Sequence, residues 1–179
     1  EIRKQIEFMK ECQKRIKNIL AICWGMQVAV TAAGGVVNRG KNGAHRGIAH
    51  EIVINSDGLK HPIYKDKDKI FNTPAFNYDE VVTLPKDAIL LSSNKVNNVM
   101  ALNFETEFSK IWGIQYHPEI TYEKMITLIK FRRERLLENK SFSDEKDLES
   151  HISMIENEDK ITKKESRMRE LKNWLDLIA

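Results

Sequence analysis

One of the two cysteines has the surroundings of a nucleophile. Cys23 follows an apolar run, with Ala21 two positions before it and Gly25 two positions after it. A nucleophile on a sharp strand-to-helix turn needs small neighbours, because the strained backbone leaves little room for side chains. Such a turn would place the sulfur at a helix N-terminus, where the helix dipole favours the thiolate. A lone cysteine in an apolar run is more often a small core residue, so the turn alone leaves both interpretations open.

A histidine, a proline and a glutamate in succession form the second candidate for chemistry. Pro118 fixes its own φ and favours an extended backbone at His117. Residues two apart in an extended chain point to the same side, so Glu119 can hold one imidazole nitrogen while the other faces a thiol. A base oriented by a carboxylate is what a Cys-His nucleophile requires. In isolation, the same three residues would read as a loop histidine beside a surface glutamate.

The residues around Cys23 predict the elements that would position it. Apolar residues recur at helical spacing through residues 1–17, with charges between them, which predicts an amphipathic helix. Asn18–Ile22 is a short apolar run and predicts a strand buried on both faces. Met26–Ala33 is rich in small residues and precedes two glycines, which is typical of a helix and its C-terminus. We therefore predict a helix, a strand, a tight turn and a helix, as in an α/β layered fold.

The same region raises the question of a membrane span. Asn18–Val37 is nearly all apolar and is long enough to cross a bilayer. It nevertheless contains Gln27, Thr31 and three glycines, and its pattern changes midway from strand-like to helix-like. We favour the buried strand-turn-helix and predict no membrane contact.

The rest of the chain divides into a strand-rich middle and a helical end. Runs bounded by turn residues predict strands at Ile48–Ile54, Lys69–Phe76, Ala88–Ser93, Val99–Phe104 and Ile111–Tyr116. An apolar stripe predicts one long helix over Tyr122–Leu137. We assign residues 1–139 to the main domain and residues 140–179 to a helical extension that folds back on it. A disordered tail is the alternative, against which Trp174 and its neighbouring leucines argue.

Composition excludes several classes of protein. Apolar residues make up 41% of the 179 residues and charged residues 31%, as in a soluble globular protein. The net charge is only +3, without a basic stripe carrying interleaved aromatics, so we predict no nucleic-acid surface. The two cysteines lack Cys-x-x-Cys spacing, so they support neither a disulfide framework nor a zinc site, and free thiols suit the cytosol. Residues 1–17 are charged, so we do not expect them to be a signal peptide. His45, His50 and His61 lack metal-ligand spacing, so we predict no metal.

Together, the two candidate segments resemble the class I, or triad, glutamine amidotransferases. That family carries a G-x-C-x-G-x-Q turn followed by a G-[VI]-Q-[FY]-H-P-E segment, and the counterparts here are Ala21–Gln27 and Gly113–Glu119, in the same order. Within the family, the chain looks most like stand-alone domains similar to the amidotransferase part of GMP synthase. That narrower likeness is carried by Thr31–Gly35, Gly47–Ile52, Asp79–Pro85 and Arg169–Trp174.

The resemblance implies a fold and a reaction. The fold would be α/β, a three-layer αβα, flavodoxin-like sheet. The reaction would be glutamine hydrolysis without a cofactor, in which Cys23 forms a γ-glutamyl thioester and His117, aligned by Glu119, carries the proton to the leaving ammonia. Gln27 would help to hold glutamine, although a polar residue near a helix start needs no ligand. The backbone N–H of Trp24 would be one oxyanion donor, worth roughly 3 kcal/mol to the transition state.

The chain departs from the family pattern in three places. Family members begin with a strand-helix-strand unit and a Gly-rich loop that supplies the second oxyanion donor. This sequence starts after that unit, so we expect a sheet that lacks its first strands. Ala21 stands where the family usually has glycine. Asn77 stands where relatives often have histidine, near the glutamine site.

These departures leave two alternatives to a glutaminase. The first is a truncated pseudoenzyme, or a fold used as a binding module, because half of the oxyanion hole would be missing. The second is a γ-glutamyl hydrolase, because such enzymes share the fold and a similar Cys-His pair. No Gly-rich phosphate loop is present, so a synthetase that used the ammonia would have to be a separate partner.

Overall fold

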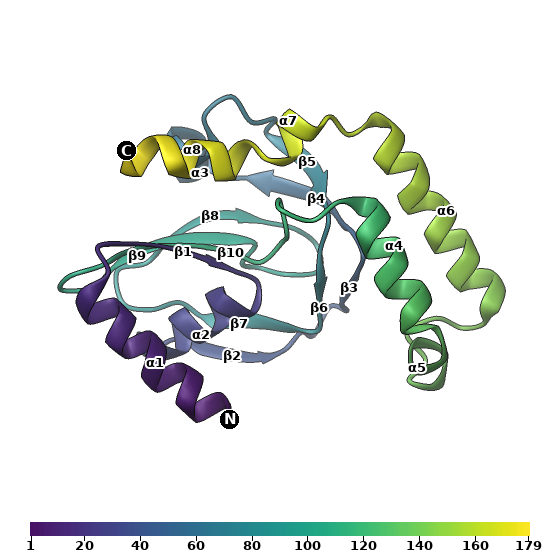
Figure 1. Cartoon of the computed structure of the whole chain (residues 1–179), viewed down its shortest axis with the longest axis horizontal. Coiled ribbons are helices and arrows are strands. Elements are labelled where there is room, and N and C mark those ends of the chain that lie inside the picture. The colour runs from purple at the N-terminus through teal and green to yellow at the C-terminus, as the bar shows by residue number, and fades with distance from the viewer.

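A mixed six-stranded sheet lies at the centre of the computed structural model, which describes residues 1–179 (Figure 1). Only the first two neighbours, β1 and β10, run parallel, and all other neighbouring pairs are antiparallel. The strand order is β1 (Asn18–Ile22), β10 (Lys110–Ile114), β9 (Ala101–Glu105), β8 (Ile89–Ser93), β4 (Ala49–Ile54) and β5 (Ile70–Thr73). The nucleophile candidate thus follows a strand with a single neighbour in the sheet.

Helices cover both faces of this sheet, which confirms the predicted three-layer α/β fold (Figure 1). One face carries α1 (Ile2–Arg15), α2 (Trp24–Ala32) and a two-stranded ribbon of β2 (Val36–Arg39) and β7 (Asp79–Thr83). The other carries α3 (Ser56–Lys60), the 3₁₀ helix Pro62–Tyr64 and α8 (Arg169–Ile178).

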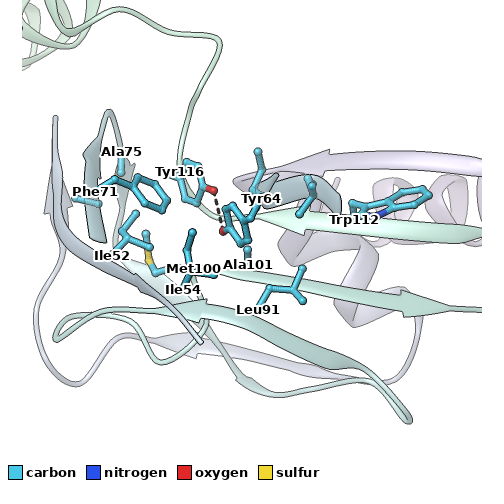
Figure 2. Packing of buried hydrophobic residues seen from close by; sticks show 13 residues of the cluster. Ile52, Ile54, Tyr64, Phe71, Ala75, Leu91, Met100, Ala101, Trp112 and Tyr116 are labelled. Atoms are coloured by element: carbon cyan, nitrogen blue, oxygen red, sulfur yellow. Dashed lines mark hydrogen bonds between the residues drawn. The ribbon is translucent and has the colours of Figure 1, made fainter. Parts of the chain in front are cut away.

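The alternation of side chains along β1 explains why the sheet can be buried on both faces. Ala21 and Ile19 belong with the apolar cluster under α2, whereas Leu20 and Ile22 pack against the opposite cluster. Successive residues of a strand point to opposite faces, so an unbroken apolar run serves both cores. Figure 2 shows the second of these clusters, which includes Trp112 and the Tyr64–Tyr116 pair.

A third apolar cluster joins the extension to the body. It lies between α4 (Tyr122–Phe131), α5 (Arg133–Glu138) and α6 (Glu145–Ile161), and α7 (Lys164–Arg167) leads from there to α8. Gly47, just after the short strand β3 (His45–Arg46), has φ +99°, and a Cβ there would lie 2.7 Å from Ile129 and 2.8 Å from Ile155. Glycine therefore lets the two helices pack closely on this loop.

The extension is helical, as predicted. Trp174 on α8 meets Trp112 on β10 edge-to-face, with ring centroids 6.4 Å apart. The disordered alternative is therefore wrong for the segment that carries Trp174. None of the helices in the structure combines the length and apolarity that crossing a membrane requires.

Several predicted boundaries differ from the structure for identifiable reasons. The predicted strand Lys69–Phe76 is interrupted at Pro74, which has no N–H for a ladder, so β5 ends there and β6 (Phe76–Asn77) pairs with β3 instead. The predicted helix Tyr122–Leu137 is two helices that meet at Arg132. Residues 56–58, among the turn residues that bound the predicted strand Ile48–Ile54, lie in the helix α3, because the Asn55 side chain caps its first amides. The ribbon β2–β7 was not predicted.

Candidate active site

Cys23 lies at a strained junction between β1 and α2. Its φ is 50° and its ψ is −108°, a positive-φ conformation that costs about 1–3 kcal/mol in a residue other than glycine. Its backbone N–H donates to the carbonyl of Ile114 at 2.7 Å, which fastens the turn to β10. The junction therefore presents the sulfur at the carboxyl end of the strand and the N-terminus of the helix.

Two glycines lie near this junction, and packing requires a glycine at only one of them, Gly113. A Cβ on Gly25 would meet no atom of the more distant chain within 4 Å, so tertiary packing does not require glycine at this position. Gly25 lies in the first helical turn, and its open side faces away from the packed strands. The close approach is at Gly113 of β10 instead, where a Cβ would lie 2.6 Å from the Met26 side chain. That glycine lets α2 settle directly over the sheet beside Cys23.

His117 and Glu119 lie together at the end of β10. The imidazole Nδ1 is 2.7 Å from Glu119 Oε1, and a carboxylate can only accept, so Nδ1–H donates. The backbone N–H of His117 donates to the carbonyl of Pro74 at 2.8 Å, which anchors the segment to the loop after β5. The histidine side chain is 19% exposed and the glutamate side chain 38%. The two side chains meet as predicted, but the backbone that brings them together differs: residues 118–119 form a turn, closed by a hydrogen bond from the Ile120 N–H to the His117 carbonyl at 3.2 Å, in place of the extended segment.

Cys23 and Glu119 together change the protonation of His117. Burial disfavours the imidazolium, but hydrogen bonds and charges from Cys23 and from Glu119 outweigh it and raise the pKa of His117 to about 9. The sulfur therefore lies close enough to act on the ring. At neutral pH the histidine carries a proton that it can give away.

This pKa predicts a pH dependence of stability. Because the pKa rises from 6.5 to about 9 on folding, the stabilisation is complete below pH 6.5 and is lost as pH rises through 9. We expect the free energy of unfolding to fall by an amount on the order of 3 kcal/mol across that window. Urea unfolding under reducing conditions, below and above the window, measures it. His117→Gln should flatten the dependence, and an equal fall in that variant would contradict the assignment.

Two glutamine side chains form a buried chain that ends on the sulfur. Gln115 donates from Nε2 to Cys23 Sγ at 3.4 Å, and its Oε1 accepts from Gln27 Nε2 at 3.1 Å. Gln27 Nε2 also donates to the backbone carbonyl of Asp79 at 2.9 Å. The Gln27 nitrogen is therefore committed to the protein, and only its oxygen is left to accept from a ligand.

Trp24 offers its backbone N–H to the site, whereas its indole N–H donates to a residue of α1. The first hydrogen bond of α2 runs from Gln27 N to Cys23 O at 3.1 Å, so the amides of Trp24, Gly25 and Met26 have no partner within the helix. The indole Nε1 donates to Gln5 Oε1 on α1 at 2.7 Å, and the residue is 46% exposed. The amides next to the sulfur form an anion-binding end of the helix.

Asn77, at the position where relatives often have histidine, is a buried structural residue. Its Oδ1 lies 2.9 Å from Nδ1 of His45, and its amide nitrogen donates to the carbonyl of Asp79 and to Asn97 Oδ1, both at 3.0 Å. Burial lowers the pKa of His45 and so favours the neutral imidazole. Its Nδ1–H donates to Asn77 Oδ1, because an amide oxygen can only accept. The network fixes the loop between β6 and β7, which forms one wall of the site.

The extension holds the segment that carries His117 on both sides. Arg167, only 8% exposed, donates to the carbonyls of Pro118 and Ile120, the residues on either side of Glu119. Before the histidine, the hydroxyl of Tyr116 donates to Glu170 Oε1 at 2.7 Å. Hydrogen bonds from α7 and α8 therefore hold residues 116–120. The helical extension therefore lies directly behind the site.

A cavity of about 380 Å³ opens beside Cys23. Trp24 and Gln27 line it, so the structure brings these two predicted residues to the same opening as the cysteine. The opposite walls come from the β6–β7 loop and from the junction of α4 with α5, and they carry Phe76–Asp79, Arg132 and Arg135. A volume of this size is typical of a site for a small molecule.

Sequence reasoning missed some of the residues that shape the site. Gln115 lies in the same short segment as His117 and Glu119, but no local pattern indicated that its side chain would reach Cys23. Arg167 and Glu170 had no local signal, since each acts on backbone or side chains about fifty residues away in sequence. Arg132 could be recognised only once the helix was seen to break there.

Comparisons with known proteins identify the family of the chain. Residues 1–133 match the family model for glutamine amidotransferase class-I. A γ-glutamyl-L-1-hydroxyisopropylamide hydrolase of Pseudomonas sp. is 29% identical over 98% of this chain and 66% of its own length. A glutamine-hydrolysing GMP synthase subunit of Methanosarcina acetivorans is 32% identical over 59% of this chain and 52% of its own length. The chain thus spans between about half and two thirds of these relatives.

Solved structures share the fold. A glutamine amidotransferase of Thermotoga maritima superposes with a TM-score of 0.71 at 19% identity, covering 98% of this chain and 68% of that one. A second, from Methylobacillus flagellatus, gives a TM-score of 0.62 at 14% identity and covers 96% of this chain and 69% of its own. At such identities the likeness concerns the fold alone, whereas the family match extends over three quarters of the sequence. The chain belongs to the class I glutamine amidotransferase family.

Proposed function

We propose that the chain hydrolyses the side-chain amide of glutamine through a thioester on Cys23 and releases ammonia. The observation that supports this most is the contact of His117 with Glu119 at 2.7 Å, in a position where Cys23 and Glu119 both raise the pKa of the imidazole. A base oriented by a carboxylate is what a Cys-His nucleophile requires. Cys23, His117 and Glu119 would then be the nucleophile, the acid-base and the residue that orients it.

The reaction we propose has two halves. The Cys23 sulfur attacks the γ-carbonyl carbon, the carbonyl electron pair moves to oxygen, and the N–H of Trp24 stabilises that oxyanion. His117 gives its proton to the amide nitrogen as the C–N bond breaks, and ammonia leaves. Water then attacks the thioester, His117 takes a proton from it, and glutamate and the thiol are released. Gln27 supports glutamine binding with its free oxygen, since its nitrogen is already engaged.

The use of the ammonia is a separate part of the proposal. The relatives that are glutamine-hydrolysing GMP synthase subunits suggest that a separate synthetase chain would receive it. Both cysteines are free, which suits a reducing compartment, so we propose the cytosol as the location.

A second candidate is hydrolysis of a γ-glutamyl amide that releases an amine instead of ammonia. The observation that favours it is the extent of the match to the Pseudomonas hydrolase, which covers 98% of the chain and so includes the helical extension, whereas the GMP synthase subunits match 58–65% of the chain. The same three side chains would serve either reaction, because the acyl half is γ-glutamyl in both.

Trapping the acyl-enzyme tests the shared step. We expect acid-quenched protein, incubated with glutamine or with γ-glutamylethylamide, to gain the mass of one glutamyl group on the peptide that contains Cys23. Release of ammonia or of ethylamine distinguishes the two candidates. If neither substrate labels Cys23 or is turned over, the chain acts as a binding module and the proposal is wrong.

A further inference from the structure

The cavity beside Cys23 is unusually rich in positive charge. Arg39 from β2 and Arg132 and Arg135 from the α4–α5 junction all line it. Asp79 is the single acidic residue among its twelve lining residues. A guanidinium stays protonated at any physiological pH, so the cavity permanently carries three positive charges against one negative charge.

None of these three arginines takes part in an ion pair within the protein. Arg39 lies over the ring of Tyr78, 4.4 Å from its centroid, and Arg132 lies over Phe76 at 5.2 Å. Stacking on aromatic rings orients a guanidinium without neutralising it, so its N–H groups remain free for an anion. The neighbouring Arg133 behaves differently, because it is paired with Glu145 and Glu149 of α6.

The charge of free glutamine does not match this lining. Glutamine brings one α-carboxylate and one α-ammonium, which one arginine and Asp79 would satisfy. Two guanidiniums would remain without a counter-charge, and water weakens their mutual repulsion because all three arginines are exposed. A substrate with one more carboxylate would relieve that repulsion and gain charge-assisted hydrogen bonds.

We propose that the site prefers γ-glutamyl amino acids, in which the amine half carries a free carboxylate, over glutamine and γ-glutamyl alkylamines. Arg132 and Arg135 bind the additional carboxylate. The inference rests on the proposed function and narrows its substrate: the same thioester forms on Cys23, and the proton from His117 goes to the nitrogen of a leaving amino acid instead of ammonia. Water then restores the thiol and releases glutamate.

A matched pair of ligands tests the preference. γ-Glutamylglycine and γ-glutamylethylamide are nearly isosteric and differ by a carboxylate in place of a methyl group. Calorimetry on the Cys23→Ala chain compares their dissociation constants without turnover. We expect γ-glutamylglycine to bind about tenfold more tightly or better, the factor of one charge-assisted contact. The difference should shrink as ionic strength rises.

Variants then assign the preference to residues. Arg132→Gln combined with Arg135→Gln should bring the two dissociation constants together, whereas Arg133→Gln, which alters a paired neighbour outside the cavity, should leave the difference intact. Equal affinity for both ligands, no binding of either, or a preference that survives the double substitution overturns the inference. Selective binding together with an absence of turnover in the unmodified chain supports the inference and refutes the proposed hydrolysis.

Discussion

Replacing Cys23 by alanine should lower the rate of amide hydrolysis by at least about 10⁴-fold, the size of effect seen when an enzyme loses its nucleophile. Without the Cys23 sulfur, the site has no nucleophile that can accept the glutamyl group. His117 and Glu119 would keep their mutual contact, but neither the N–H of Trp24 nor the histidine can form a thioester. Steady-state release of ammonia or amine, with the substrate that the acyl-enzyme experiment selects, measures the loss.

The second cysteine provides the matched control. Cys12 lies on α1 and does not line the cavity, so Cys12→Ala should keep the full rate. The fold of Cys23→Ala should also persist, because alanine meets the same backbone strain at φ 50° that cysteine does. A melting temperature close to that of the unmodified chain excludes misfolding as the cause. Substantial turnover by Cys23→Ala would show that the hydrolysis, if observed, is performed elsewhere.

The parts of the site that the sequence could predict are those encoded over short stretches. The run Asn18–Ile22 is apolar at every position but the first, a pattern typical of a strand with a core on each face, which is where it lies. The His-Pro-Glu order likewise limits the local geometry, because proline fixes its own φ and restricts the residue before it. Local sterics fix both features, so no knowledge of distant residues was needed.

The parts that the sequence could not predict depend on contacts between distant residues. The ribbon β2–β7 pairs residues 36–39 with residues 79–83, and neither stretch contains a local signal that identifies the other as its partner strand. The same holds for the arginines of the cavity. Arg132 and Arg133 are adjacent and chemically identical, yet one stacks on Phe76 in the cavity and the other pairs with acids of α6. Adjacent residues on a helix point in different directions, and these two also lie where α4 ends and α5 begins.

Helices α7 and α8 of the extension stabilise the segment that carries His117. Cys23 is held in a conformation that costs energy, and the His117 segment is a loop that few of its own contacts would fix. Arg167 supplies two of the missing contacts from α7, and Glu170 supplies another from α8. Precision at the site is therefore provided by helices that do not line the cavity.

Glu170 is the residue whose loss should affect stability most. Its carboxylate is fully buried and accepts from Lys67 Nζ at 3.1 Å and from the Tyr116 hydroxyl at 2.7 Å, while the Lys67 side chain is 1% exposed. Burial already lowers the pKa of Lys67, and Glu170 opposes that effect. Glu170→Gln preserves the shape and an acceptor for Tyr116 but leaves the lysine charge buried without its carboxylate. We expect a loss of about 3–5 kcal/mol, the usual cost of breaking a buried pair.

Two comparisons separate this buried charge from a general weakening of α8. On the same helix, Lys172 and Asp176 form a pair that is 65% and 62% exposed, so Lys172→Ala should change stability by no more than about 0.5 kcal/mol. Adding Lys67→Met to Glu170→Gln removes the unpaired charge and should recover most of the lost stability, since neutral replacement of both partners is often tolerated. Urea unfolding of the four proteins measures this. If the double variant is no more stable than Glu170→Gln alone, the cost lies in lost packing, and the buried charge is not what holds α8 behind His117.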